Sequence, residues 1–214
     1  TRYHVRTWAT NEAGLAYGED MTFGTACLID SSAGVHGTVL PEGAVEVPYG
    51  GSQEFLIAAD PWYNVAQILL DGLPIGVTNS MHFDGTSSNH ALNVLFSEKL
   101  AAMGTPEWWL ADHGFTSDFD AAATNDDEPD GFFTWQEYIA DTDPKDSNSY
   151  PRVDLVVTEG SDPVVTWPAS SGRVYQIHRC DDLVIGQWDT QQLSLGAGQW
   201  TDTNPPPTTN RYYR

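Results

Sequence analysis

One stretch of this sequence, Asp126–Glu137, holds residues whose types and spacing fit a definite chemistry. Counted from Asp126, oxygen-bearing side chains stand at positions 1, 3, 5, 9 and 12, with Gly131 at position 6 and an apolar residue at position 8. Short carboxylates at alternate positions point inward when a chain wraps a large, hard cation, and glycine allows the sharp turn between them. The spacing therefore predicts a calcium-binding loop.

The predicted calcium ligands follow from these positions. They are the side chains of Asp126, Glu128, Asp130, Thr134 and Glu137 and the backbone carbonyl of Phe132. Glu137 closes the shell with both carboxylate oxygens. Two residues depart from the usual pattern, because Glu128 replaces Asp or Asn at position 3 and Pro129 is unusual at position 4. The alternative interpretation is an acidic, solvated turn in front of a helix.

The charge of the chain argues against several classes of partner. The sequence carries 30 acidic and 9 basic residues, a net charge of -21, and such a surface repels nucleic acid and anionic membranes. Residues 104–150 hold 12 of the acids against the single Lys145, which favours a divalent cation there. No apolar run has the length of a membrane span, and no signal peptide is present. Calcium and the few lysines predict an extracellular or cell-surface location, and the abrupt, strand-like start indicates a piece of a longer secreted protein.

The strand pattern predicts a mainly β protein, in which small β-sandwich modules are joined by a short helical calcium-binding segment. Residues 1–25 form two expected strands, 3–9 and 16–23, with turn residues between them. This stretch, TRYHVRTWATNEAGLAYGEDMTF, resembles the last two strands of a fibronectin type III sandwich, with a Tyr-x-x-Arg strand, an Asn-x-x-Gly turn and a Gly-Glu-x-x-x-Phe strand. A lone hairpin is marginal in water. We therefore expect this hairpin to dock on another surface.

Residues 26–98 show short alternating strands separated by turn signals. Their Gly-x-Val…Pro-x-Gly, Tyr-Gly-x-x-x-x-Phe and Leu-x-Val-x-Phe patterns resemble the divergent internalin-type β-repeat of bacterial surface proteins. The resemblance implies a β-rich spacer or adhesive module rather than a catalyst. Trp62 and Tyr63 have two open interpretations, a sugar-stacking platform or side chains buried under their own loop.

Residues 99–150 form the predicted helical segment. Thr105 and Pro106 signal a helix start, with Thr105 as the cap and Pro106 at the first helical position. Residues 134–140 form the helix that leaves the loop. On that helix, Trp135, Tyr138 and Ile139 are expected to pack against Trp108 or Trp109.

The stretch 105–144 is similar to a calcium segment near the ends of bacterial secreted proteins, related to dockerin-like and thrombospondin type 3 loops and built around an EF-hand-like loop. A Trp-Gln-Glu-Tyr helix and a following Thr-Asp-Pro are typical of that family, and both occur here. The family pattern implies Asp143 and then Asp120 as additional ligands, in this site or in a second one. The alternative for each is a solvated role, as it is for Asp118 and Asp141.

Residues 151–214 return to short strands with Gly, Pro and Asp turns. They resemble the fibronectin-like terminal domain that commonly follows such a calcium segment. In that resemblance residues 210–214 correspond to the sixth strand, and a seventh strand is missing. An open sheet edge is a template for another strand.

These two incomplete modules suggest a hypothesis of self-association, in which the hairpin of one subunit completes the C-terminal sandwich of the next. A heterologous contact of this kind propagates into a head-to-tail homopolymer. The two cysteines, Cys27 and Cys180, could pair within a chain, pair between chains or stay free. In the docked sheet their strand ends fall on the same side, which makes them candidates for an inter-subunit disulfide. The alternative is that the sequence is cut within a domain, so that its incomplete ends are artefacts or pack within the same chain.

No catalytic motif stands out. The six histidines form no i, i+4 pair, and the sequence contains no Gly-x-Ser-x-Gly elbow and no phosphate-binding glycine loop. We therefore predict a non-catalytic, calcium-stabilised extracellular structural protein, a subunit of a fibre or surface stalk. The alternative is a carbohydrate-binding or spacer module of a secreted hydrolase, with a polysaccharide as its partner and with Trp62 or Trp200 in contact with the glycan.

Overall fold

The computed structural model describes residues 2–156, 162–195, 198–203 and 211–214. The chain is mainly β, with 44% of it in strands and 11% in helices, which confirms the predicted class. It divides into two compact units, Thr1–Lys99 and Leu100–Arg214. No helix in the described ranges is both long and apolar enough to cross a membrane.

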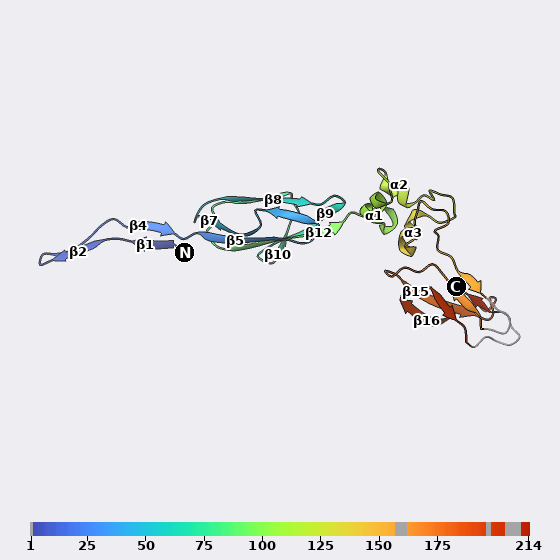
Figure 1. Ribbon diagram of the computed structural model, residues 1–214. Helices are drawn as coiled ribbons and strands as arrows, with labels where there is room; N and C mark the ends of the chain where they lie inside the picture. Colours follow the sequence, from blue (N-terminus) through green and yellow to red (C-terminus); the bar gives the residue numbers. More distant parts are fainter. Residues whose placement is uncertain (1, 157–161, 196–197, 204–210) are drawn as a thin grey trace. The chain divides into compact units, whose positions relative to one another are not determined.

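The first strands of the chain form a two-stranded antiparallel ribbon (Figure 1, blue). They are β1 (Arg2–Val5), β2 (Trp8–Asn11), β3 (Gly14–Tyr17) and β4 (Met21–Gly24). β1 pairs with β4 and β2 with β3, so each of the two predicted strands is interrupted once. At the turn the side chain of Asn11 accepts a hydrogen bond from the amide of Ala13 (2.7 Å), and Gly14 has a φ of +139°, which suits glycine. Every residue of the four strands is exposed.

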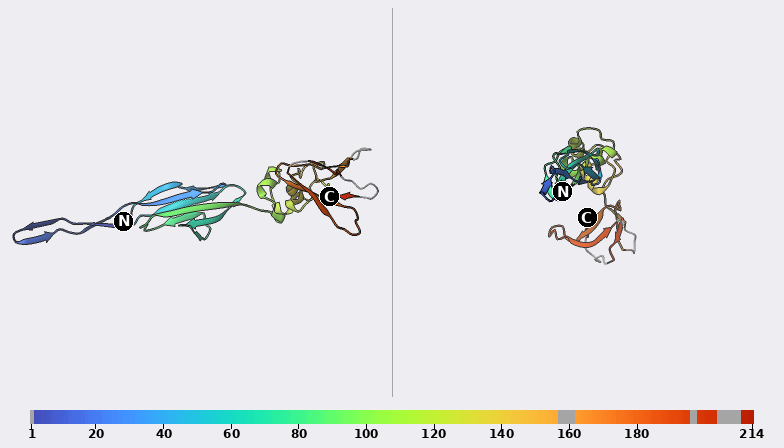
Figure 2. Two further views of the ribbon diagram at one scale, coloured as in Figure 1. Left: turned by 90° about the horizontal axis from the view of Figure 1, so that it is seen from below. Right: turned by 90° about the vertical axis from the view of Figure 1, so that its left-hand side faces the viewer.

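Two facing sheets make up the rest of the first unit (Figure 2). Their strands are β5 (Cys27–Ala33), β6 (Gly37–Leu40), β7 (Gly43–Val47), β8 (Gln53–Ala59), β9 (Tyr63–Leu70), β10 (Leu73–Ile75), β11 (Ser80–Phe83) and β12 (His90–Glu98). The larger sheet has the order β10-β9-β12-β5-β7 and the smaller one the order β11-β8-β6. Among these pairs β12 and β5 run parallel, and the others are antiparallel.

The core of this β module lies between the two sheets. Buried and exposed residues alternate along β5 and β8, as expected for strands with one face against a core. Nine buried side chains form the cluster: Ile29, Val39, Val47, Phe55, Ile57, Ile68, Phe83, Leu92 and Val94. The rings of Phe55 and Phe83 meet edge to face at 5.7 Å, a favourable aromatic geometry.

The second unit begins with short helices. They are η1 (Ala102–Gly104), α1 (Glu107–Asp112), α2 (Phe119–Ala123) and α3 (Thr134–Ala140). The predicted helix over 134–140 is confirmed. The predicted cap of the first helix is wrong, because Pro106 itself occupies the N-cap position and Thr105 is buried ahead of it. Pro106 donates no amide hydrogen and its fixed φ suits the entry to a helix, so the helix begins one residue later than predicted.

A small aromatic core holds the helices together. Trp109 and Leu110 of α1 are buried with Ala123 of α2, and Tyr138 of α3 packs against this cluster. The rings of Trp109 and Tyr138 lie 5.3 Å apart, which confirms the predicted contact. The prediction was wrong for Ile139, whose side chain is 56% exposed.

The last part of the second unit is a pair of three-stranded sheets (Figure 2, orange to red). One has the order β13-β14-β17, from Asp154–Val156, Val164–Thr166 and Gln199–Thr201; the other has the order β16-β15-β18, from Asp189–Leu195, Val174–Cys180 and Tyr212–Tyr213. Among the described residues of these sheets, Val165, Trp167 and Ile177 form a buried cluster. Part of the predicted strand 153–158 lies outside the described residues.

Candidate metal centre

The candidate metal loop is folded by its own first carboxylates. Asp126 accepts hydrogen bonds from the amides of Asp130 (3.3 Å) and Gly131 (3.0 Å), and one oxygen of Asp130 accepts the amide of Phe132 (2.8 Å). Gly131 has a φ of +97°, a conformation that L side chains rarely adopt. These bonds draw the chain into a tight turn around its acidic side chains.

The structure brings three of the predicted ligands together. One carboxylate oxygen from each of Glu128, Asp130 and Glu137 lies within 4.8 Å of the others. Glu128 and Asp130 come from the loop, whereas Glu137 stands on α3, which starts directly after the loop. Glu137 has no exposed surface, and the loop residues Glu128 and Asp130 are half-buried.

Four oxygen atoms of this carboxylate trio have no hydrogen-bond partner in the described structure. They are both carboxylate oxygens of Glu128, one of Asp130 and one of Glu137, and all four atoms are buried. The other oxygen of Glu137 accepts a hydrogen bond from the hydroxyl of Thr142 (3.3 Å). A buried carboxylate without a partner costs several kcal/mol, on the order of the penalty for burying any unpaired charge. A cation among these oxygens removes that penalty, so the trio fits a bound metal ion.

Raised pKa values in the trio without an ion also favour a bound cation. Burial, together with the charges of Glu128 and Asp130, raises the pKa of Glu137 from its ordinary value to about 8. Burial also raises the pKa of Glu128, together with the charge of Asp130. The three carboxylates cannot all be ionised without a counter-charge at close range.

Three further predicted ligands lie in the loop with other contacts. Both oxygens of Asp126 accept backbone amides, although a carboxylate oxygen bonded once keeps a second lone pair. The hydroxyl of Thr134 donates to the carbonyl of Asn125 (3.1 Å), which ties the end of the loop to its start. The ring of Phe132 stacks on Tyr150 at 6.0 Å. Coordination by Asp126, Thr134 and Phe132 stays a prediction.

The two additional ligands implied by family resemblance have structural contacts of their own. One oxygen of Asp143 accepts the amide of Lys145 (3.0 Å), and one oxygen of Asp120 accepts the amide of Ala102 (2.7 Å). Neither carboxylate belongs to the trio. Asp127, at the second position of the loop, forms a half-exposed ion pair with Lys145 (2.6 Å) and is therefore engaged away from the trio.

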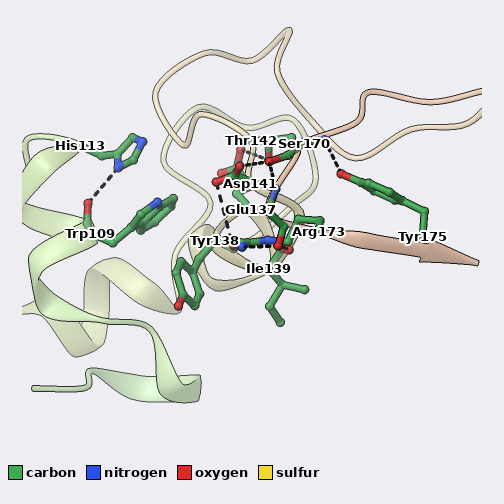
Figure 3. Close-up of polar contacts among 11 residues, drawn as sticks. Trp109, His113, Glu137, Tyr138, Ile139, Asp141, Thr142, Ser170, Arg173 and Tyr175 are labelled. Atoms are coloured by element: carbon green, nitrogen blue, oxygen red, sulfur yellow. Dashed lines mark hydrogen bonds and ion pairs between the residues drawn. The ribbon is translucent and has the colours of Figure 1, made fainter. Parts of the chain in front are cut away.

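Contacts of Arg173, which we call the Arg173 clasp, join α3 to the C-terminal sheets. The sequence did not reveal them. Arg173 donates to the carbonyls of Ile139 (2.7 Å) and Tyr138 (2.5 Å), the last carbonyls of α3, and also lies 3.7 Å from Asp141 (Figure 3). Asp141 in turn accepts a hydrogen bond from the hydroxyl of Ser170. A cation at the C-terminal end of a helix satisfies open carbonyls and interacts favourably with the helix dipole. No local sequence signal marks Arg173, because its partners lie 34 and 35 residues earlier.

Both cysteines are buried, free thiols. Cys27 lies in the first unit and donates to the carbonyl of Thr86 (3.7 Å), whereas Cys180 lies in the second unit and donates to the carbonyl of Asp182 (3.0 Å). The structure therefore has no intrachain disulfide between them. A bridge between subunits stays a prediction, and it requires both sulfurs to become accessible.

The aromatic residues named for glycan binding differ in their surroundings. Tyr63 is half-buried and its ring stacks flat on His36, with centroids 4.0 Å apart. Trp62 is also half-buried and, like His36, has a positive φ, 67° for Trp62 and 69° for His36. Trp200 packs against Tyr213 at 6.2 Å on the small C-terminal core.

Comparison with known proteins gives no match to a protein-family model, to a curated protein or to a solved structure. The resemblances to fibronectin type III, internalin-type and dockerin-like modules therefore stay predictions.

Proposed function

We propose that this protein is a non-catalytic, calcium-stabilised structural protein of the extracellular space or cell surface, a fibre or stalk subunit that assembles head-to-tail by strand donation. The observation that carries the calcium part is the trio of Glu128, Asp130 and Glu137 with its four buried, unpartnered oxygens. The loop around the trio is the one that the spacing from Asp126 predicts, so sequence pattern and tertiary placement support the same site.

Calcium suits this site better than softer metals. All of the candidate ligands are oxygen atoms, from carboxylates, a hydroxyl and a carbonyl, and hard oxygen ligands select calcium, magnesium or manganese. Glutamates at two corners of the trio can each offer two oxygens, which suits the high coordination number of calcium. Magnesium demands a nearly ideal octahedron and keeps several waters, a poor match to buried carboxylates.

The role of the ion is to hold the second unit together. Ligands in the loop and on α3 are drawn to one cation, which fixes the first turns of α3. The last carbonyls of the same helix are held by Arg173 from the C-terminal sheets. Ion binding thereby stabilises both the helical segment and its attachment to the sandwich, as a fibre or stalk subunit requires.

Thermal unfolding with and without calcium tests this proposal. The 214-residue chain is stripped of metal and then melted in calcium or in EGTA, with magnesium as a comparison. Calcium present at about 100 times its dissociation constant raises stability by about 2.7 kcal/mol, and we expect a higher melting temperature in calcium only. Superimposable curves in calcium and EGTA would reject the site.

A second candidate function is that of a polysaccharide-binding accessory module. The exposed His36 ring stacked on Tyr63, beside the half-buried Trp62, offers an aromatic surface on which a sugar ring could pack. Positive φ values at His36 and Trp62 are backbone outliers of the kind that cluster at binding sites. Glycan-array binding that is lost in Trp62→Ala would favour this function over the structural one.

A further inference from the structure

The N-terminal ribbon has one apolar face that nothing in its own strands covers. Tyr3 stands opposite Phe23 and Val5 opposite Met21, so these four side chains share one face of the β1–β4 pair. They are 45%, 54%, 53% and 68% exposed, respectively. The rings of Tyr3 and Phe23 stack at 5.3 Å, which keeps the face ordered for contact.

The opposite face of the same ribbon is polar. Arg2 donates to Thr22 (3.5 Å), and His4 lies 2.9 Å from Asp20. The ribbon is thus amphipathic, like a strand pair at the edge of a larger sandwich. Two strands alone are marginally stable in water, because their apolar face stays exposed to solvent.

The C-terminal sheets have a matching defect. β18 is the last strand of the order β16-β15-β18, and β13 is the first strand of the order β13-β14-β17, so each sheet of the described part ends in an unpaired edge there. A groove of about 310 Å³ lies beside these two edges. Its lining residues are Val153, Leu155, Val165, Arg211, Tyr212 and Tyr213.

The groove is apolar where a strand would be added. Val153 and Leu155 stand two residues apart, so their side chains face the same side of the extended chain. These side chains are 52% and 54% exposed, respectively. Tyr213 packs on the core cluster and its hydroxyl donates to the buried Asp202 (2.9 Å). Arg211 is held by Asp202 (2.7 Å) and Asp181 (2.6 Å), so the rim is fixed in place.

We infer that this groove is the acceptor surface for the β1–β4 ribbon of a second copy of the chain. The inference rests on the proposed head-to-tail function and names its two contact surfaces. β4 adds to the free edge of β18 through main-chain hydrogen bonds, and Met21 and Phe23 enter the groove opposite Val153 and Leu155. β18 is only two residues long, so apolar burial supplies most of the binding free energy.

A second copy fits as the occupant because every copy of the chain carries both surfaces, the ribbon in one compact unit and the groove in the other. An amphipathic ribbon with a free edge and an apolar groove with a free edge are each incomplete, and each supplies what the other lacks. Since the two surfaces differ, two subunits joined by one such contact still have one unoccupied ribbon and one unoccupied groove. Such a heterologous contact extends into a filament unless its rotation closes a ring.

A complementation experiment tests the inference. Phe23→Lys damages the ribbon, Leu155→Lys damages the groove, and Val35→Lys, at a residue 79% exposed outside both surfaces, is the matched control. Sedimentation velocity of the full chain in calcium is measured for each protein over a wide concentration range. We expect the wild type and Val35→Lys to form growing oligomers, whereas each damaged variant associates about 30-fold or more weakly, the usual cost of losing an anchor residue.

Mixing the two damaged variants is the decisive step. The groove of Phe23→Lys is intact and so is the ribbon of Leu155→Lys, so the mixture should form dimers that grow no further. A wild type that stays monomeric, a Leu155→Lys variant that still polymerises, or a mixture without dimers would each overturn the inference. The melting shift in calcium is recorded for every variant, so a failed calcium site is distinguished from a failed docking surface.

Discussion

The two β regions of this protein, β5–β12 in the first unit and β13–β18 in the second, are stabilised to different degrees by their own cores. Among the described residues, nine buried apolar side chains form the core cluster of the first region and three form that of the second. In the second, Val153, Leu155 and Val174 stay more than half exposed although they lie in or next to strands. Because apolar burial is the main stabilising contribution to a domain, the described part of the second region receives less stabilisation from its own core than the first.

Contacts outside this core add to the stability of the second region. Arg173 fastens the sheets to α3, and the carboxylate trio fixes α3 when an ion is bound. The groove beside β18 marks where a further strand would complete the sandwich. The first β region thus has a large core of its own, whereas the second has a smaller described core and the contacts of Arg173 with α3, to which the proposed ion and partner would add.

The largest effect that separates the two regions is expected from the core of the first. Phe55→Ala removes a fully buried ring and should destabilise the first unit by about 3–5 kcal/mol. Six of the eight tryptophans lie in the second unit, so fluorescence reports mainly on that unit, whereas circular dichroism reports on both. We expect the β-sheet signal to be lost early while most of the tryptophan signal persists. Simultaneous loss of both signals would contradict the separation.

The next effect concerns the ion. Asp130→Ala removes a member of the trio and should abolish the calcium-dependent rise in the melting temperature of the second unit, about 2.7 kcal/mol at saturating calcium. Asp127→Asn is the matched control, since Asp127 belongs to the same loop but pairs with Lys145. Calorimetry of the full chain measures both variants. An unchanged calcium response in Asp130→Ala would exclude that residue as a ligand.

A smaller effect is expected from the clasp. Arg173→Lys keeps the charge but cannot reach two carbonyls with the fork of a guanidinium, so the second unit should lose about 1.5–2 kcal/mol, the value of a charge-assisted hydrogen bond. Arg152→Lys, at a more exposed arginine, should change stability by less than about 0.5 kcal/mol. Urea unfolding followed by tryptophan fluorescence compares the two. Equal effects would show that the contact with α3 adds no stability.

A further effect is the pH dependence of the metal-free protein. Burial raises the pKa of Glu137 to about 8 in the folded state, from an ordinary value of 4.5. The folded state therefore holds this proton more tightly than the unfolded state, and its contribution to stability is complete below pH 4.5 and lost as pH rises to about 8. Metal-free protein should melt at lower temperature at pH 8 than at pH 5. Glu137→Gln should flatten this slope, and the same slope in the variant would assign it to other groups.

Local features of the site could be predicted from the sequence because they depend on near neighbours. The alternating acids after Asp126, the glycine at position 6 and the helix from Thr134 to Ala140 all follow from spacing and backbone preference. The same holds for the mainly β class, since the alternation along strands such as β5 reflects one buried face. The helix cap at Thr105 was mispredicted because two overlapping start signals compete there, and the structure uses Pro106.

The loop, the helix that follows it and the excess of acid around them can be derived from the local sequence alone. Which acids converge depends on tertiary packing, since Glu128, Asp130 and Glu137 meet while Asp143 and Asp120 accept hydrogen bonds from backbone amides elsewhere. The tertiary structure alone revealed the Arg173 clasp and the groove beside β18. The physical reason is distance along the chain: a loop closes through bonds between residues a few positions apart, whereas a clasp or a groove requires the packing of segments that no local pattern connects.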